Sequence, residues 1–171
     1  VEELPVQISF NLRDDPIPSF GALQQARAEV YVSRGAVNRF TDVVLALADS
    51  GEEGRRKGLG LWMLGRWNEA AELLSNYADD DVASFTRANA LLSNGRPGDA
   101  LPVFQRLSDS YPDEPRPRGG ALEAKLEAYR DAGVRPFIGG QFHEYVFAEG
   151  GWQALIPFYR EALALGFDTI E

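Results

Sequence analysis

The sequence predicts an all-α fold, a solenoid of helical hairpins with a short extended N-terminal arm. Glycines recur with a period of 30 residues, at Gly35, Gly65 and Gly95. Each of them separates two amphipathic stretches, which suits a residue that tolerates the left-handed conformation at the end of a helix. Small, basic and large apolar residues also recur at fixed offsets from these glycines. A repeated period of this kind predicts stacked units, each made of two helices and a tight turn.

Composition sets the class of protein and excludes several kinds of chemistry. The 171 residues are 44% hydrophobic and 25% charged, which is typical of one globular domain. The 26 acidic and 17 basic residues leave a net charge of −9, which disfavours general binding to nucleic acids or anionic membranes. The absence of cysteine excludes disulfide scaffolds and thiolate metal sites. No apolar run approaches the roughly 18 residues of a membrane span, and a cytoplasmic and a periplasmic location both stay open.

The first residues differ from the rest of the chain. Val6, Ile8, Phe10 and Leu12 alternate with polar residues, a period of two that predicts a half-buried strand. We therefore expect an extended arm over residues 1–18. Because the chain begins with valine rather than methionine, we also expect a processed protein or a piece of a longer one.

The helical repeat domain is expected over residues 19–171. Its units are predicted at about 19–50, 51–80 and 81–112, with a degenerate fourth unit at 118–171. Asp80 or Asp81 is a suitable N-cap for the helix that follows, and Pro97 suits the first turn of the next helix because it lacks an N–H. The prolines between Pro112 and Arg118 predict an extended connector before the fourth unit.

Two junctions resemble those of a known family. The stretches Gly65-Arg66-Trp67-Asn68-Glu69-Ala70 and Gly95-Arg96-Pro97-Gly98-Asp99-Ala100 resemble the turn between the two helices of a tetratricopeptide repeat. Residues 87–92 resemble the first helix of a variant of this repeat that is common in bacteria. The resemblance is closest over 51–112. It implies a non-catalytic scaffold that binds a peptide or protein segment in the concave groove of the solenoid, with no cofactor.

The groove is expected to be lined by the first helix of each unit. Helical geometry turns the recurring basic residues Arg27, Lys57 and Arg87 toward the neighbouring helices, so the groove is expected at the residues two places before and after them and one turn further on. Exposed aromatic and apolar groups beside polar ones are typical of peptide-binding patches. Trp62 is equally well explained by packing between units. The predicted groove residues are Arg55, Leu59, Trp62, Met63, Phe85, Asn89 and Leu92.

Other candidate chemistry has simpler explanations. His143 is the only histidine, and without cysteine partners it is a poor metal ligand, so we expect a structural role. The run Asp79–Asp81 lacks the spacing of a calcium loop and is better explained by helix capping. The sequence therefore predicts no catalytic residue and no metal site.

Two alternative functions remain open. One is self-association, in which the N-terminal arm pairs with a second copy to form a homodimer. The other is an accessory helical domain of a larger enzyme.

Overall fold

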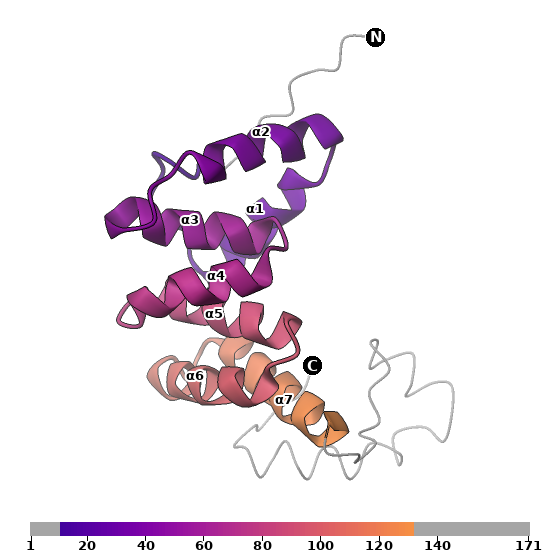
Figure 1. Ribbon diagram of the computed structural model, residues 1–171. Helices are drawn as coiled ribbons and strands as arrows, with labels where there is room; N and C mark the ends of the chain where they lie inside the picture. The colour runs from indigo at the N-terminus through magenta and orange to yellow at the C-terminus, as the bar shows by residue number, and fades with distance from the viewer. Residues whose placement is uncertain (1–10, 132–171) are drawn as a thin grey trace.

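The computed structural model describes residues 11–131, which form a stack of helices (Figure 1). Within this range there are seven α-helices, one short 3-10 helix and no strand, so the predicted all-α fold is confirmed. None of these helices is long and apolar enough to cross a membrane. The elements are α1 Phe20–Val30, α2 Arg34–Leu45, α3 Gly51–Met63, α4 Trp67–Leu74, η1 Ser75–Tyr77, α5 Asp81–Ser93, α6 Pro97–Ser110 and α7 Pro115–Asp131.

Two helical hairpins, α3–α4 and α5–α6, are closed by the same turn. Gly65 and Gly95 have φ angles of 73° and 70°, in the left-handed region that favours glycine. The N–H of Arg66 donates to the carbonyl of Leu61 at 2.9 Å, and Arg96 repeats this bond to Leu91 at 2.9 Å. These bonds pair carbonyls that the last turn of each helix would leave unsatisfied. The period read from the sequence therefore corresponds to one repeated helix end.

Small residues let the two helices of a hairpin approach closely. A Cβ atom on Gly58 of α3 would lie 2.4 Å from a methyl group of Leu74 in α4. Ala88 is fully buried at the position that corresponds to Gly58, and Ala70 and Ala100 are fully buried in the second helices of the two hairpins. The close contact of the hairpins thus depends on side chains no larger than methyl.

Helix starts follow the predicted capping residues in two places. The Asp80 carboxylate accepts a hydrogen bond from the N–H of Ala83 at 2.7 Å and so caps α5. Pro97 is in the first turn of α6, as predicted.

The predicted extended connector over 112–118 is wrong in its second half. Helix α7 begins at Pro115, before the predicted start of the fourth unit at 118. Pro115 and Pro117 both fall in its first turn, where backbone N–H groups have no partner within the helix, so proline costs little. Pro115 and Pro117, which interrupt the helical periodicity of the sequence, are therefore compatible with the start of a helix.

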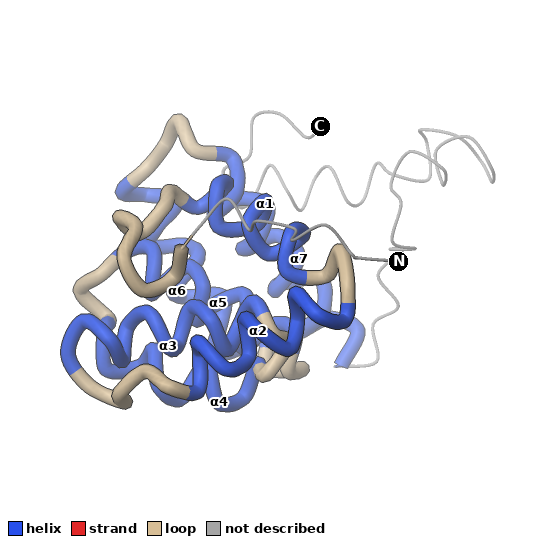
Figure 2. The backbone as a smooth tube through the Cα atoms, turned by 90° about the horizontal axis from the view of Figure 1, so that it is seen from above, coloured by secondary structure: helices blue, strands red, loops and turns tan. Residues whose placement is uncertain are grey.

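The first unit is not a hairpin like the others. Gly35 lies inside α2 without a left-handed φ angle, and Ala28, the expected interface residue, is exposed. Helix α2 stacks on α3, where Val44 and Leu12 approach Gly60. Helix α1 makes only slight contact with α2 and also lies against α3 and α5. Seen from above, α1 and α4 are on opposite sides of the stack (Figure 2).

The predicted N-terminal strand falls mostly outside the described residues. Its last member, Leu12, is buried in a turn in which the N–H of Asp15 donates to the carbonyl of Asn11 at 3.0 Å. The described part of the arm is therefore a turn packed on the helices.

Candidate functional site: the inner face beneath α1

Helix α1 lies against α3 and α5 on the side of the stack opposite α4, which we call the inner face (Figure 2). Phe20, the first residue of α1, stacks on Phe85 of α5 with 4.5 Å between ring centroids and 20° between planes. The same ring meets the edge of Tyr111 at 5.9 Å, and Phe85 meets the edge of Phe104 at 5.7 Å. Four aromatic rings thus join α1 to α5 and α6, in geometries that aromatic pairs favour.

The other end of α1 is held on α3 by an arginine. The guanidinium of Arg27 lies 5.2 Å from the ring centroid of Trp62 and 5.9 Å from that of Tyr31, within the range of cation–π attraction. Its Nε also donates to the carbonyl of Met63 at 3.4 Å. Helix α1 therefore runs from the end of α3 to the start of α5.

The first turn of α1 also meets the first turn of α7. A Cβ atom on Gly21 would lie 2.5 Å from the guanidinium at the far end of the Arg116 side chain. Arg116 itself is paired with Glu114 at 2.8 Å.

Four of the seven predicted groove residues are not open to solvent. Leu59 and Met63 are 0% exposed, Phe85 is 4% exposed and Trp62 is 6% exposed. Their expected exposure is wrong. Helix α1 covers Trp62 and Phe85, and Leu59 and Met63 belong to the buried core. Asn89 and Leu92, one and two turns beyond Phe85, are half-buried and make up the less covered part of the inner face.

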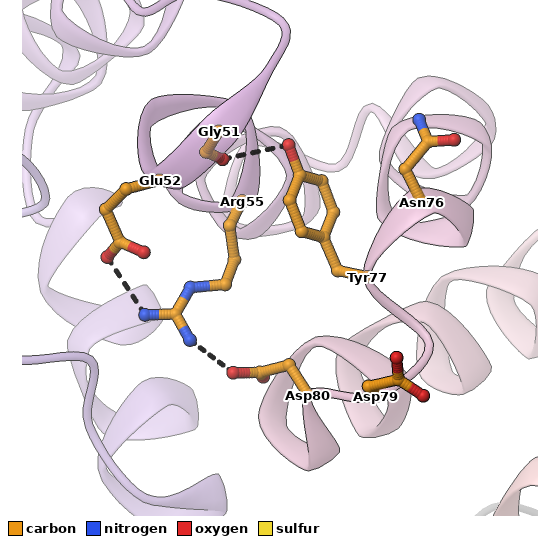
Figure 3. A pocket seen from close by; sticks show the side chains of 7 residues that line it. All are labelled: Gly51, Glu52, Arg55, Asn76, Tyr77, Asp79 and Asp80. Atoms are coloured by element: carbon orange, nitrogen blue, oxygen red, sulfur yellow. Dashed lines mark hydrogen bonds and ion pairs between the residues drawn. The ribbon is translucent and has the colours of Figure 1, made fainter.

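Arg55 has a role that the sequence did not reveal. Its guanidinium pairs with Asp80, the cap of α5, and donates to Glu52 at 2.9 Å (Figure 3). The hydrogen bond from Arg55, with a contribution from Arg56, lowers the pKa of the Glu52 carboxyl. The Tyr77 hydroxyl donates to the carbonyl of Gly51 at 2.9 Å on the same rim. Arg55 thus links α3 to the start of α5 beside an open depression, and its charge is already compensated.

Arg56 is a structural anchor that sequence analysis missed. Its Nη1 donates to the carbonyls of Leu12 at 2.9 Å and Asp15 at 2.7 Å, and its Nε to Glu52 at 2.9 Å. The side chain thereby fixes the segment that leads into α1. No local motif predicts such a contact, because the partners of Arg56 are backbone carbonyls far away in the sequence.

The aspartate run has structural partners. Asp80 caps α5, and Asp81 accepts hydrogen bonds from the Tyr111 hydroxyl at 2.5 Å and from Arg106 at 2.9 Å. Over residues 11–131 no three acidic, histidine or cysteine side chains are grouped as metal ligands would be. His143 lies outside the part of the chain that the structure describes.

Comparison with known families agrees with the repeated hairpins. The profile of the family described as tetratricopeptide repeat matches residues 55–115 and, in an overlapping match, residues 85–133. No curated protein and no solved structure gave a match to the chain. Tetratricopeptide repeats are in general protein–protein interaction modules and are typically non-catalytic. The family predicted from the two glycine junctions is confirmed, because residues 55–133 match the tetratricopeptide repeat family.

Proposed function

We propose that this protein is a non-catalytic interaction scaffold that binds a protein segment on the inner face of α3 and α5. The family match supports an interaction role, and one observation supports this face in particular: it already accommodates a helix, α1, through stacked and edge-on aromatic rings. Trp62 and Phe85 would supply the apolar contacts. Asn89 and Leu92, which are less covered, would be the first residues that a partner contacts.

The mix of groups on this face suits peptide recognition. Buried aromatic side chains surrounded by partly exposed polar ones are typical of the residues that dominate binding energy at protein interfaces. The Asn89 side chain donates to the carbonyl of Phe85 at 2.8 Å, which leaves its own carbonyl oxygen as an acceptor for a partner backbone. Arg55, which is tied to Asp80 and Glu52, would orient the start of α3 without contacting a partner directly.

Site-specific photo-cross-linking tests this assignment in the native extract. A photoreactive phenylalanine analogue is placed at Asn89 on the inner face, and a matched one at Gln105, which is exposed on α6. We expect a discrete cross-linked partner band from position 89 and none from position 105. The same bands from both positions, or a band from 105 alone, would place binding elsewhere and refute the proposal.

A further inference from the structure

Helix α1 has the features of a ligand for the inner face, and the inference drawn from them rests on the proposed function. Its buried side chains, Phe20, Leu23, Ala26 and Val30, form one apolar stripe. Its exposed positions include Gln24 and Gln25. This is the pattern of an amphipathic helix that lies in a groove.

Helix α1 has few stabilising features of its own. Its contact with α2 is no larger than its contact with α3 or with α5, whereas the helices of the other two hairpins pack extensively on one another. Ser19 precedes it without a capping hydrogen bond from its side chain, and no acidic residue stabilises the first turn. An isolated helix of about 11 residues is marginal in water. The helical structure of α1 therefore depends on the inner face beneath it.

The coverage of the inner face is uneven. Helix α1 buries Trp62 and Phe85 but leaves Asn89 and Leu92 half-buried. A longer helix could contact these two residues first and then extend over the face as α1 leaves.

We propose that α1 is an internal ligand of the inner face and that the partner is an amphipathic helix that replaces it. The replacing helix presents an aromatic side chain to Phe85 and, two turns later, an arginine to Trp62, as Phe20 and Arg27 do. Only molecules in which α1 is undocked can bind such a helix. The apparent affinity is therefore the intrinsic affinity multiplied by the fraction of molecules in which α1 is undocked.

A peptide-binding experiment on the full chain tests this proposal. The probe is a fluorescein-labelled peptide with the sequence of residues 19–31, followed by fluorescence anisotropy. The test variant, Phe20→Asp with Leu23→Asp, places charge on the buried stripe of α1. The control variant, Gln24→Asp with Gln25→Asp, adds the same charge on its exposed face. Circular dichroism and a cooperative melting transition verify that both variants are folded.

We expect the test variant to bind the peptide at least about tenfold more tightly than the wild type and the control variant do, because release of α1 raises the competent fraction. An unlabelled peptide carrying Phe20→Asp should fail to compete. If the folded test variant binds no more tightly than the control, the inner face does not accept this helix and the proposal is wrong.

A second measurement keeps α1 intact. The chain has no cysteine, so Gly21→Cys with Arg116→Cys creates one pair for a bismaleimide, at positions that the length of the Arg116 side chain bridges between α1 and α7. We expect a cross-link within one chain, and at least about tenfold weaker peptide binding once it has formed. Unchanged peptide binding would refute the proposal. A cross-linked dimer would also refute it, by showing that α1 occupies the inner face of a second copy.

The two proposals fail in different ways. Equal photo-cross-linking from Asn89 and Gln105 would refute the proposal that any partner binds at the inner face. Photo-cross-linking from Asn89 alone, combined with no gain in peptide binding by the test variant, would keep the scaffold function and reject only the helical internal ligand.

Discussion

Two neighbouring glycines of α7 should respond to the same substitution with opposite signs. Gly119 is exposed, and a Cβ atom there would meet nothing within 4 Å. A Cβ atom on Gly120 would lie 2.5 Å from Cε1 and 2.7 Å from Cδ1 of Phe104, whose ring is fully buried. Alanine at both positions removes the same backbone flexibility, so the difference between the variants isolates the packing of α7 on α6.

The expected magnitudes follow from these surroundings. Replacing glycine by alanine within a helix stabilises it by about 1 kcal/mol, and Gly119→Ala should show this gain. Gly120→Ala should gain the same amount but lose about 1–3 kcal/mol, because the ring of Phe104 has no free space into which to move. A difference of ~2 kcal/mol between the two variants corresponds to roughly 4–8 °C in melting temperature for a domain of this size.

Thermal unfolding followed by circular dichroism at 222 nm measures both variants under the same conditions. We expect Gly119→Ala to melt above the wild type and Gly120→Ala to melt at or below it. If Gly120→Ala raised the melting temperature as much as Gly119→Ala does, the close packing of α7 on Phe104 would be wrong.

Three further predictions concern a turn, a cap and a pH-dependent contact. Gly95→Ala should lower the free energy of unfolding in urea by about 1–2 kcal/mol, because φ is 70° at this position, and Gly95→Asn should lower it less. Equal losses in the two variants would argue against a left-handed turn. Asp80→Ala should cost about 1–2 kcal/mol, since it removes the cap of α5, whereas the exposed neighbour Asp79→Ala should stay within about 0.5 kcal/mol of the wild type in the same assay. The hydrogen bond from Tyr111, aided by Arg106, lowers the pKa of Asp81 below its ordinary value of 3.8. A carboxyl group with a lowered pKa stabilises the folded chain at pH values above 3.8, and this stabilisation is lost as the pH falls through the pKa of the folded state. Tyr111→Phe should therefore lower the melting temperature at neutral pH by an amount that shrinks in acid, and a difference that stayed constant down to about pH 2 would contradict this reasoning.

The hairpins could be predicted from the sequence because their signals are local. Gly65 and Gly95 end helices wherever the rest of the chain goes, and Pro97 fits only the start of the next helix. The start of α7 was harder to predict. A proline in a first turn and a proline in a connector are the same local pattern, and only the packing of α7 on α6 distinguishes them.

The position of α1 could not be predicted, because its apolar stripe would suit any apolar surface. One residue carried a signal. Phe40 in α2 stands where Ala70 and Ala100 stand in the other two units, and all three are buried. A benzyl group at a position that needs a methyl group keeps a second helix from approaching as closely. The first unit therefore leaves α1 available to pack elsewhere.

The inner face shows the same division between local and long-range information. Helical periodicity correctly groups Phe85, Asn89 and Leu92 on one side of α5. Whether Phe85 is exposed depends on Phe20 of α1, which is far away in the sequence, and no pattern within α5 contains that information. The pairing of Arg55 with Asp80 likewise joins two units and is hidden among many other charges.

The placement of α1 also determines the order in which this chain can fold. In a simple repeat array each unit needs only its neighbours, but the surface beneath α1 exists only after α3, α5 and α6 have stacked. Helix α1 is synthesised before all of them, so it leaves the ribosome before the surface on which it docks exists. Closing this long loop adds non-local contacts to an otherwise local topology, which slows the final step relative to hairpin formation.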